Sequence, residues 1–180
     1  MASGLQAALL LARGRSDGLR QLDTDLAAAA RSFRAAWVAL PAFVALQLIA
    51  WADGGVPALP GSALAFDLLT YVIGWVGFAL LSREVAAALG REASWTRFII
   101  VWNWCNVVQY ALLLAAELPG LLGAPDWLAQ AFWIVGLCWS LWLEWLAARL
   151  TLQVSSLVAA GLVGLDIAIG LLLAAVTPVT

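Results

Sequence analysis

The chain has 180 residues, of which 64% are hydrophobic and 11% are charged. A soluble domain of ordinary composition has about 45–50% apolar and about 25% charged residues. A soluble fold of this size could not bury so much apolar surface, so the composition excludes that class. It indicates an all-α, multi-pass membrane protein.

The inventory of reactive side chains is narrow. All nine basic residues are arginine, and the sequence contains neither lysine nor histidine. The missing lysine excludes a Schiff-base chromophore and a P-loop, and the missing histidine excludes imidazole ligands for haem, chlorophyll or zinc. Cys105 and Cys138 stand far apart inside apolar segments, which favours structural thiols. We therefore expect no cofactor and no metal, and the net charge of −2 predicts no nucleic-acid binding.

Residues 1–30 form the most polar part of the chain, and we expect them to lie in the cytoplasm. The apolar run 5–12 is too short to span a bilayer, and no basic residue precedes it, as a signal peptide would require. It predicts a short interfacial amphipathic helix over residues 4–13. The residues expected to face lipid are Leu5, Ala8, Leu9 and Ala12. Asp23 or Thr24 is expected to cap the helix that follows.

Five apolar segments follow, separated by turn residues and charges. Pro41 near the start of the first segment predicts a kink. The last boundary is the hardest, because one helix over residues 127–177 would be about 75 Å long, against a bilayer core of about 30 Å. The polar stretch 149–156 therefore predicts a turn. The predicted spans, within one membrane domain over residues 31–180, are 35–52, 61–81, 98–118, 127–148 and 157–177.

The distribution of arginine tests this threading. Five spans place the N-terminus, loop 82–97 and loop 149–156 on one side of the membrane, and that side carries all nine arginines. Loops 53–60 and 119–126 lie with the C-terminus on the other side and carry none. The positive-inside rule then predicts a cytoplasmic N-terminus. An arginine-only composition rich in alanine and leucine is typical of a GC-rich bacterial genome, so we expect the bacterial inner membrane.

Eleven tryptophans are unusually many for this length. Tryptophans near the span boundaries favour anchoring at the membrane–water interface. The deeper ones either pack between helices or line an aromatic cavity for a lipid or a hydrophobic pigment. The boundary group is Trp37, Trp51, Trp95, Trp127 and Trp145, and the deeper group is Trp75, Trp102, Trp104, Trp133, Trp139 and Trp142.

The fifth span carries a stripe of small residues at every fourth position. Small residues at this spacing let two helix backbones approach closely in lipid. We expect the stripe to pack within the monomer, and the alternative is a contact with another membrane subunit or a second copy of the chain. The stripe consists of Ser156, Ala160, Gly164 and Ala168.

Three carboxylates lie within the predicted spans, where a charged side chain costs about 2.5–3.5 kcal/mol at the bilayer centre. Asp67 and Glu144 stand near opposite boundaries, so both can reach water or headgroups. Asp166 stands near the midplane with no arginine at its depth. Three interpretations follow for Asp166: it is protonated and donates to a neighbouring helix, it faces a hydrated cavity, or it meets another subunit.

The third span carries a polar face. At 100° per residue, four of its polar side chains fall within about 120° of one another. They are Asn103, Asn106, Gln109 and Tyr110. If the last three spans pack together, a continuous polar core forms, which serves either as hydrogen-bond glue or as a path for a proton, an ion or a substrate. The candidate core is Asp67, Asn103, Asn106, Gln109, Ser140, Glu144 and Asp166.

These features favour a non-enzymatic membrane protein. Short loops and little recognisable chemistry favour an accessory, assembly or scaffold subunit that packs against lipid or another membrane protein. The alternative is a small transporter or proton-coupled permease that uses the polar core, although no inverted repeat divides the five spans into halves. An intramembrane aspartyl protease is disfavoured, because Val163-Gly164-Leu165-Asp166 departs from the Gly-x-Gly-Asp signature of those enzymes.

Overall fold

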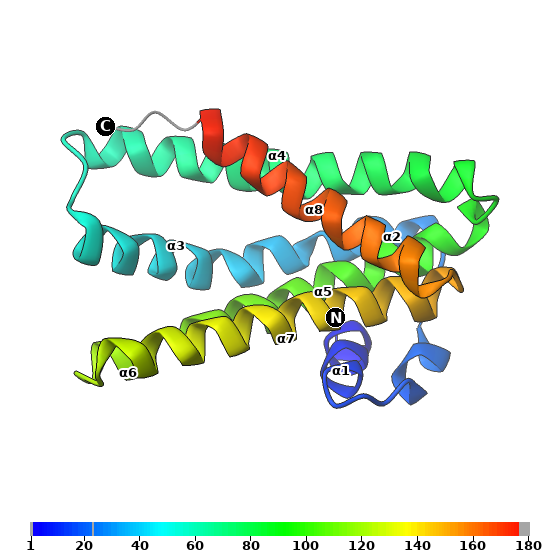
Figure 1. Ribbon diagram of the computed structural model, residues 1–180. Coiled ribbons are helices and arrows are strands. Elements are labelled where there is room, and N and C mark those ends of the chain that lie inside the picture. The colour runs from blue at the N-terminus through cyan, green and yellow to red at the C-terminus, as the bar shows by residue number, and fades with distance from the viewer. Residues whose placement is uncertain (1, 23, 177–180) are drawn as a thin grey trace.

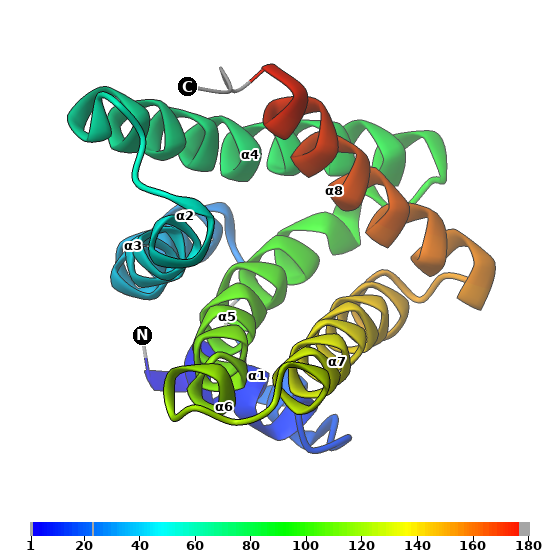
Figure 2. The ribbon, with the colours of Figure 1, turned by 60° about the vertical axis from the view of Figure 1, so that its left-hand side comes forward.

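The computed structural model describes residues 2–22 and 24–176, and within those residues it is all-helical (Figure 1). The helices over residues 34–54, 92–116 and 126–152 lie roughly alongside one another, whereas the helix over residues 60–88 and the C-terminal helix run across them (Figure 2). The elements are α1 (Ala2–Leu11), the short 3-10 helix η1 (Asp17–Gln21), α2 (Leu26–Ser32), α3 (Arg34–Gly54), α4 (Pro60–Ala88), α5 (Glu92–Ala116), α6 (Leu118–Leu121), α7 (Asp126–Leu152) and α8 (Ser156–Val176).

Five helical segments are long and apolar enough to cross a bilayer, which confirms the predicted number of spans. The first consists of α2 and α3 together, Leu26–Gly54, so helical structure already runs across residue 30, where the sequence suggested a boundary. The other four are α4, α5 with α6, α7, and α8. The predicted end of the last span, Thr177, lies outside the described residues.

The helices on either side of loop 82–97 extend further than the predicted spans. Helix α4 continues to Ala88 instead of ending at Leu81, and α5 begins at Glu92 instead of Phe98. The apolar run ends before the helix does, because the segment after Leu81 is rich in alanine and contains no Gly or Pro. The turn falls at Gly90, which has a φ of 68°.

The other turns also differ in detail from the expectation. Helix α7 continues to Leu152, and Gln153 ends it in the left-handed conformation, with φ 54° and ψ 46°. The predicted loop 119–126 contains the short helix α6. Pro41 lies inside α3, which continues past it. Asp25, not Asp23 or Thr24, caps α2 by accepting a hydrogen bond from the Ala28 backbone amide, and Asp23 lies outside the described residues.

Helix α5 is the centre of the bundle. It packs against α7, α3, α4, α2 and α1, and its residues 98–105 are all buried. Helix α8 lies across α7 and α4 instead (Figure 2). Because α5 is surrounded by other helices, its polar side chains Asn103 and Gln109 are buried against protein.

Helices α3 and α4 follow each other in the chain, but their backbones stay apart over most of their length (Figure 2). The aromatic side chain of Tyr71 on α4 bridges the gap, because its hydroxyl donates a 2.8 Å hydrogen bond to the Ala36 carbonyl on α3. The space between the two helices is an apolar groove of about 340 Å³ that includes Phe33, Leu40 and Val72.

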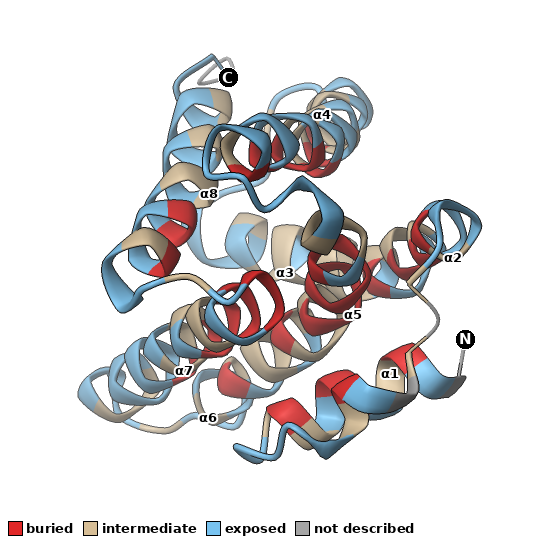
Figure 3. Ribbon diagram, turned by 90° about the vertical axis from the view of Figure 1, so that its right-hand side faces the viewer, coloured by how far each residue is buried: buried red, intermediate tan, exposed pale blue. Residues whose placement is uncertain are grey.

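Helix α1 packs one face against the rest of the chain, so Ala8, which was expected to face lipid, faces protein instead. Ala7, Ala8 and Leu11 are buried in contacts with the rest of the chain, as Figure 3 shows for the face of α1 that looks toward α5. Gly4 touches the indole of Trp104 so closely that any Cβ at this position would collide with the ring. Small side chains therefore let α1 approach α5, as between helices inside a membrane.

Candidate functional site

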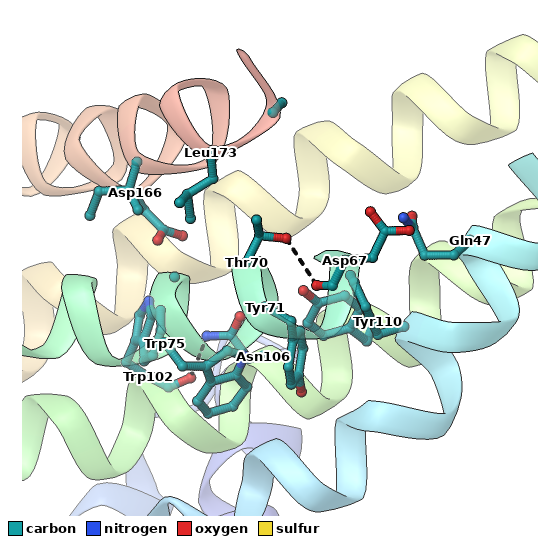
Figure 4. A pocket seen from close by; sticks show the side chains of 15 residues that line it. Gln47, Asp67, Thr70, Tyr71, Trp75, Trp102, Asn106, Tyr110, Asp166 and Leu173 are labelled. Carbon is teal, nitrogen blue, oxygen red and sulfur yellow. Dashed lines mark hydrogen bonds between the residues drawn. The ribbon is translucent and has the colours of Figure 1, made fainter. Parts of the chain in front are cut away.

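A polar cavity of about 310 Å³ opens between α3, α4, α5 and α8 (Figure 4). Each of the four helices contributes at least one polar or aromatic side chain to its wall. The cavity therefore depends on the packing of the whole bundle and not on one local motif. Its chemically distinctive lining residues are Phe43, Gln47, Asp67, Thr70, Tyr71, Trp75, Trp102, Asn106, Tyr110 and Asp166.

Two carboxylates face this cavity from different helices. Asp67 on α4 is 8% exposed, and Asp166 on α8 points toward the side lined by Trp75 and Trp102 (Figure 4). No basic side chain lines the described wall of the cavity. Ion pairs among the described residues join only Arg15 to Asp17 and Arg83 to Glu92, so neither cavity carboxylate has a cationic partner there.

Aromatic rings form much of the remaining wall. Tyr71 stands at their centre, with its ring centroid 4.6 Å from that of Phe43, 5.9 Å from that of Trp75 and 6.0 Å from that of Tyr110. Trp75 in turn packs 5.3 Å from Trp102. The face of an aromatic ring carries partial negative charge, so the aromatic wall attracts cations. The two carboxylates, when ionised, also favour a positively charged ligand.

Asn106 and Thr70 add hydrogen-bonding groups to the wall. The side-chain amide of Asn106 donates to the Trp102 carbonyl one turn earlier on α5, at 3.0 Å. Thr70 Oγ1 donates to the Asp67 carbonyl at 2.9 Å. Each bond joins a side-chain donor to a backbone carbonyl of the same helix. Neither bond occupies the Asn106 amide oxygen or the Asp67 carboxylate, so both can accept hydrogen bonds from a ligand in the cavity.

The other predicted polar residues do not line the cavity: they lie where α5 meets α7 or α2. Gln109 Nε2 donates to the Ser140 carbonyl at 2.7 Å, which ties the two helices together at mid-length. Asn103 Nδ2 donates to Ser32 Oγ at 2.7 Å and so links α5 to α2. Glu144 is 4% exposed on the same interface. The candidate core thus comprises a cavity group of Asp67, Asn106 and Asp166 and an interface group of Asn103, Gln109, Ser140 and Glu144.

Four deeply buried polar atoms have no hydrogen-bond partner within the described part of the chain: Trp102 Nε1, Asn103 Oδ1, Ser140 Oγ and Glu144 Oε1. Trp102 stands between the two groups, since it lines the cavity and also lies beside Glu144. A buried polar atom without a partner costs about 1–3 kcal/mol. These unpartnered atoms therefore lower the stability of the folded bundle.

The predicted packing stripe lies on the outward face of α8. All four of its residues are exposed, and a Cβ added at Gly164 would meet no atom within 4 Å. The side of α8 that packs against the bundle is formed instead by Ala159, Leu162 and Val163. The stripe is therefore available to another helix.

Several cavity residues were not among the predicted site residues, although the sequence carried a signal for some of them. Tyr71 stands four positions after Asp67, and Gln47 four after Phe43, so each pair shares one helix face. Of the deep tryptophans, Trp75 and Trp102 line the cavity and also pack against each other, so they fit both interpretations of the deep group. Among the boundary tryptophans, Trp37 and Trp127 are exposed, as interfacial anchors would be.

Neither the carboxylates nor the thiols gather into a metal site, because no three Cys, Asp or Glu residues of the described chain come close enough to hold an ion. Comparison of the chain with protein-family models, curated proteins and solved structures found no match.

Proposed function

We propose that the chain is a non-enzymatic multi-pass membrane protein that binds a small cationic solute in the cavity between α3, α4, α5 and α8, and that it acts as a small transporter. The proposal rests on one observation: Asp67 and Asp166 line the same cavity as several aromatic rings, and no basic side chain is among the described lining residues. The arginine distribution supports the bacterial inner membrane with a cytoplasmic N-terminus as its location.

The chemistry of the wall favours an organic ammonium over an anion or a neutral sugar. A cation over the face of a tyrosine or tryptophan gains about 0.5–2 kcal/mol, and more where water is excluded. A carboxylate at the same site adds a charge-assisted contact. The volume of about 310 Å³ lies at the lower end for ligand pockets, so the expected solute is a compact amine or quaternary ammonium.

The position of Asp166 supports transport rather than simple surface binding. It is the eleventh residue of the 21-residue helix α8. If this helix spans the bilayer, Asp166 lies near the midplane. Intramembrane carboxylates at that depth mark substrate or ion pathways, and transporter sites lie near the midplane. The other carboxylate, Asp67, lies nearer the end of α4 that carries no arginine, so we place the cavity mouth on the non-cytoplasmic side.

Binding of tetramethylammonium and choline to the purified full chain in nanodiscs tests the proposal, with isothermal titration calorimetry as the measurement. Asp166→Asn is expected to weaken binding by about tenfold or more, which corresponds to about 1.4 kcal/mol. Tyr71→Phe keeps the aromatic face and should bind within a few-fold of the parent. Glu84→Gln, which removes an exposed carboxylate far from the cavity, is the matched control. Absence of binding to both probes, or equal losses in the Asp166 and Glu84 variants, would refute solute binding.

A second candidate function, an accessory or scaffold subunit, is favoured by the outward stripe on α8. In lipid, small residues without a partner in the monomer are suited to close packing against another transmembrane helix. Gly164→Leu would block such packing, and its Cβ would have no atom of its own chain within 4 Å among the described residues. Native mass spectrometry of the solubilised protein should then show loss of a dimer or of a co-purifying subunit. A parent protein that is monomeric and free of partners would argue against this role.

A further inference from the structure

A second, basic cavity of about 130 Å³ lies at the other end of the bundle, where α1, α2, the start of α3 and α5 meet. Its polar wall carries two guanidinium side chains and two hydroxyl side chains, and Trp104 contributes its indole. It includes no carboxylate among the described residues that line it. The polar residues are Ser3, Arg31, Ser32 and Arg34.

Among the described residues, no ion pair compensates the charge at this cavity. Arg31 and Arg34 take part in neither of the two ion pairs that the described residues form. Ser3 and Gly4 belong to the first turn of α1, whose backbone amides have no acceptor within the helix and whose dipole is positive at this end. The wall therefore offers several hydrogen-bond donors and two positive charges to one small volume, which is the requirement for binding an anion.

The walls of the cavity are fixed by packing on two sides. The contact of Gly4 with Trp104 seats the start of α1 directly on α5. On the opposite wall, Ser32 is 3% exposed and accepts the 2.7 Å hydrogen bond from Asn103, while its own hydroxyl donates to the Ala29 carbonyl at 2.7 Å. The cavity is thus built by tertiary contacts and is more than a patch of surface arginines.

We propose that this cavity binds the phosphate of an anionic phospholipid headgroup between Arg31 and Arg34. The two arginines flank the junction of α2 and α3, near the N-terminal end of the first span. This end belongs to the side that carries all the arginines, where a headgroup phosphate would lie. Basic pockets between helices on the cytoplasmic side are recognised sites for anionic lipids. Arginine suits this role because its planar guanidinium can donate two parallel hydrogen bonds to one phosphate. The site is separate from the solute cavity and does not depend on the function proposed for it.

Native mass spectrometry measures this binding. The full chain is mixed with defined lipids in detergent, and the spectrum shows which lipids stay bound after the detergent is removed. Phosphatidylglycerol is expected to remain bound where phosphatidylcholine is lost. The double variant Arg31→Gln/Arg34→Gln should reduce retained phosphatidylglycerol by about tenfold or more. The control Arg91→Gln/Arg97→Gln removes two exposed arginines that also lack ion pairs in the described chain, and it should change retention less than about twofold.

A second variant separates geometry from charge. Gly4→Leu leaves the net charge unchanged but cannot keep the contact with Trp104, so it should also lose phosphatidylglycerol while the bundle still inserts. Equal losses in the two double-arginine variants would overturn the proposal in favour of nonspecific surface charge. Equal retention of the two lipids would overturn it as well. Displacement of phosphatidylglycerol by millimolar inorganic phosphate would assign the site to a soluble phosphate instead of a lipid.

Discussion

Asn103 on α5 donates a 2.7 Å hydrogen bond to Ser32 Oγ at the end of α2, and both side chains are buried. This contact joins the first span to the central helix across 71 residues of chain. Asn103 Oδ1 has no partner in the described structure, so only the nitrogen of this side-chain amide is hydrogen-bonded.

Removal of this link is expected to destabilise the bundle modestly. Asn103→Leu and Ser32→Ala should each lower the free energy of unfolding by about 1 kcal/mol, the scale measured for polar contacts between membrane helices. Unfolding in a graded detergent mixture, followed by tryptophan fluorescence, measures this change. A double variant that loses no more than the larger single loss would confirm that the two residues act through one bond, whereas additive losses would show that they are independent.

Gly136 permits close packing of α7 against α5. A Cβ at this position would lie 3.3 Å from the Cβ of Ala116, tighter than an ordinary contact. Gly136→Leu should therefore cost about 1–3 kcal/mol through overpacking. Gly77→Leu adds the same side chain at a position where a Cβ would have no neighbouring atom within 4 Å among the described residues, and it should be neutral or stabilising. Similar melting temperatures for the two variants would contradict the observed α5–α7 packing.

The buried Glu144 is expected to limit stability. Its Oε1 has no partner in the described chain, so Glu144→Leu removes an unsatisfied polar group and should raise the free energy of unfolding by about 1 kcal/mol. The same assay of detergent unfolding reports the change, with Glu84→Leu as an exposed control. A clear loss of stability in Glu144→Leu would mean that the carboxyl makes a favourable contact. A gain of stability accompanied by weaker solute uptake would be the trade-off expected of a functional residue.

Topology can be measured directly. Single cysteines at positions 57, 90 and 122, in a chain in which Cys105 and Cys138 are replaced by alanine, can be labelled with a membrane-impermeant maleimide. In intact cells, positions 57 and 122 are expected to react and position 90 is not, because the arginines lie on the side of position 90. Labelling of position 90 from outside would invert the orientation or refute the arrangement of five spans.

The spans could be predicted because hydropathy and turn residues act locally, whereas the division of the polar residues could not. Gln109 and Tyr110 are adjacent, and depth alone suggests that both meet Asp166. One residue turns a helix by 100°, so Gln109 faces Ser140 on α7 while Tyr110 faces the cavity. The rotation of α5 about its own axis decides this partition, and it is fixed by contacts with several helices at once.

The contact of α1 with the rest of the chain could not be predicted from the sequence for a related reason. A short apolar helix can cover its face with lipid or with protein, and the hydrophobicity of residues such as Leu5 and Leu9 is satisfied by either. The useful signal was size, since Gly4, Ala7 and Ala8 share a face that can approach another helix closely. Leu9 is 43% exposed and follows the expectation, whereas Ala8 does not.

The gap between α3 and α4 bears on the order in which the protein can be assembled. Helices enter a bilayer in chain order, but the main neighbour of α3 is α5, which is synthesised only after the whole of α4. Until α5 arrives, the polar side chain of Gln47 and the open side of α3 face lipid, and only residues such as Tyr71 connect the first two spans. Nascent chains that stop before Glu92 would therefore hold two loosely associated helices, the form most exposed to membrane proteases and most dependent on an insertase.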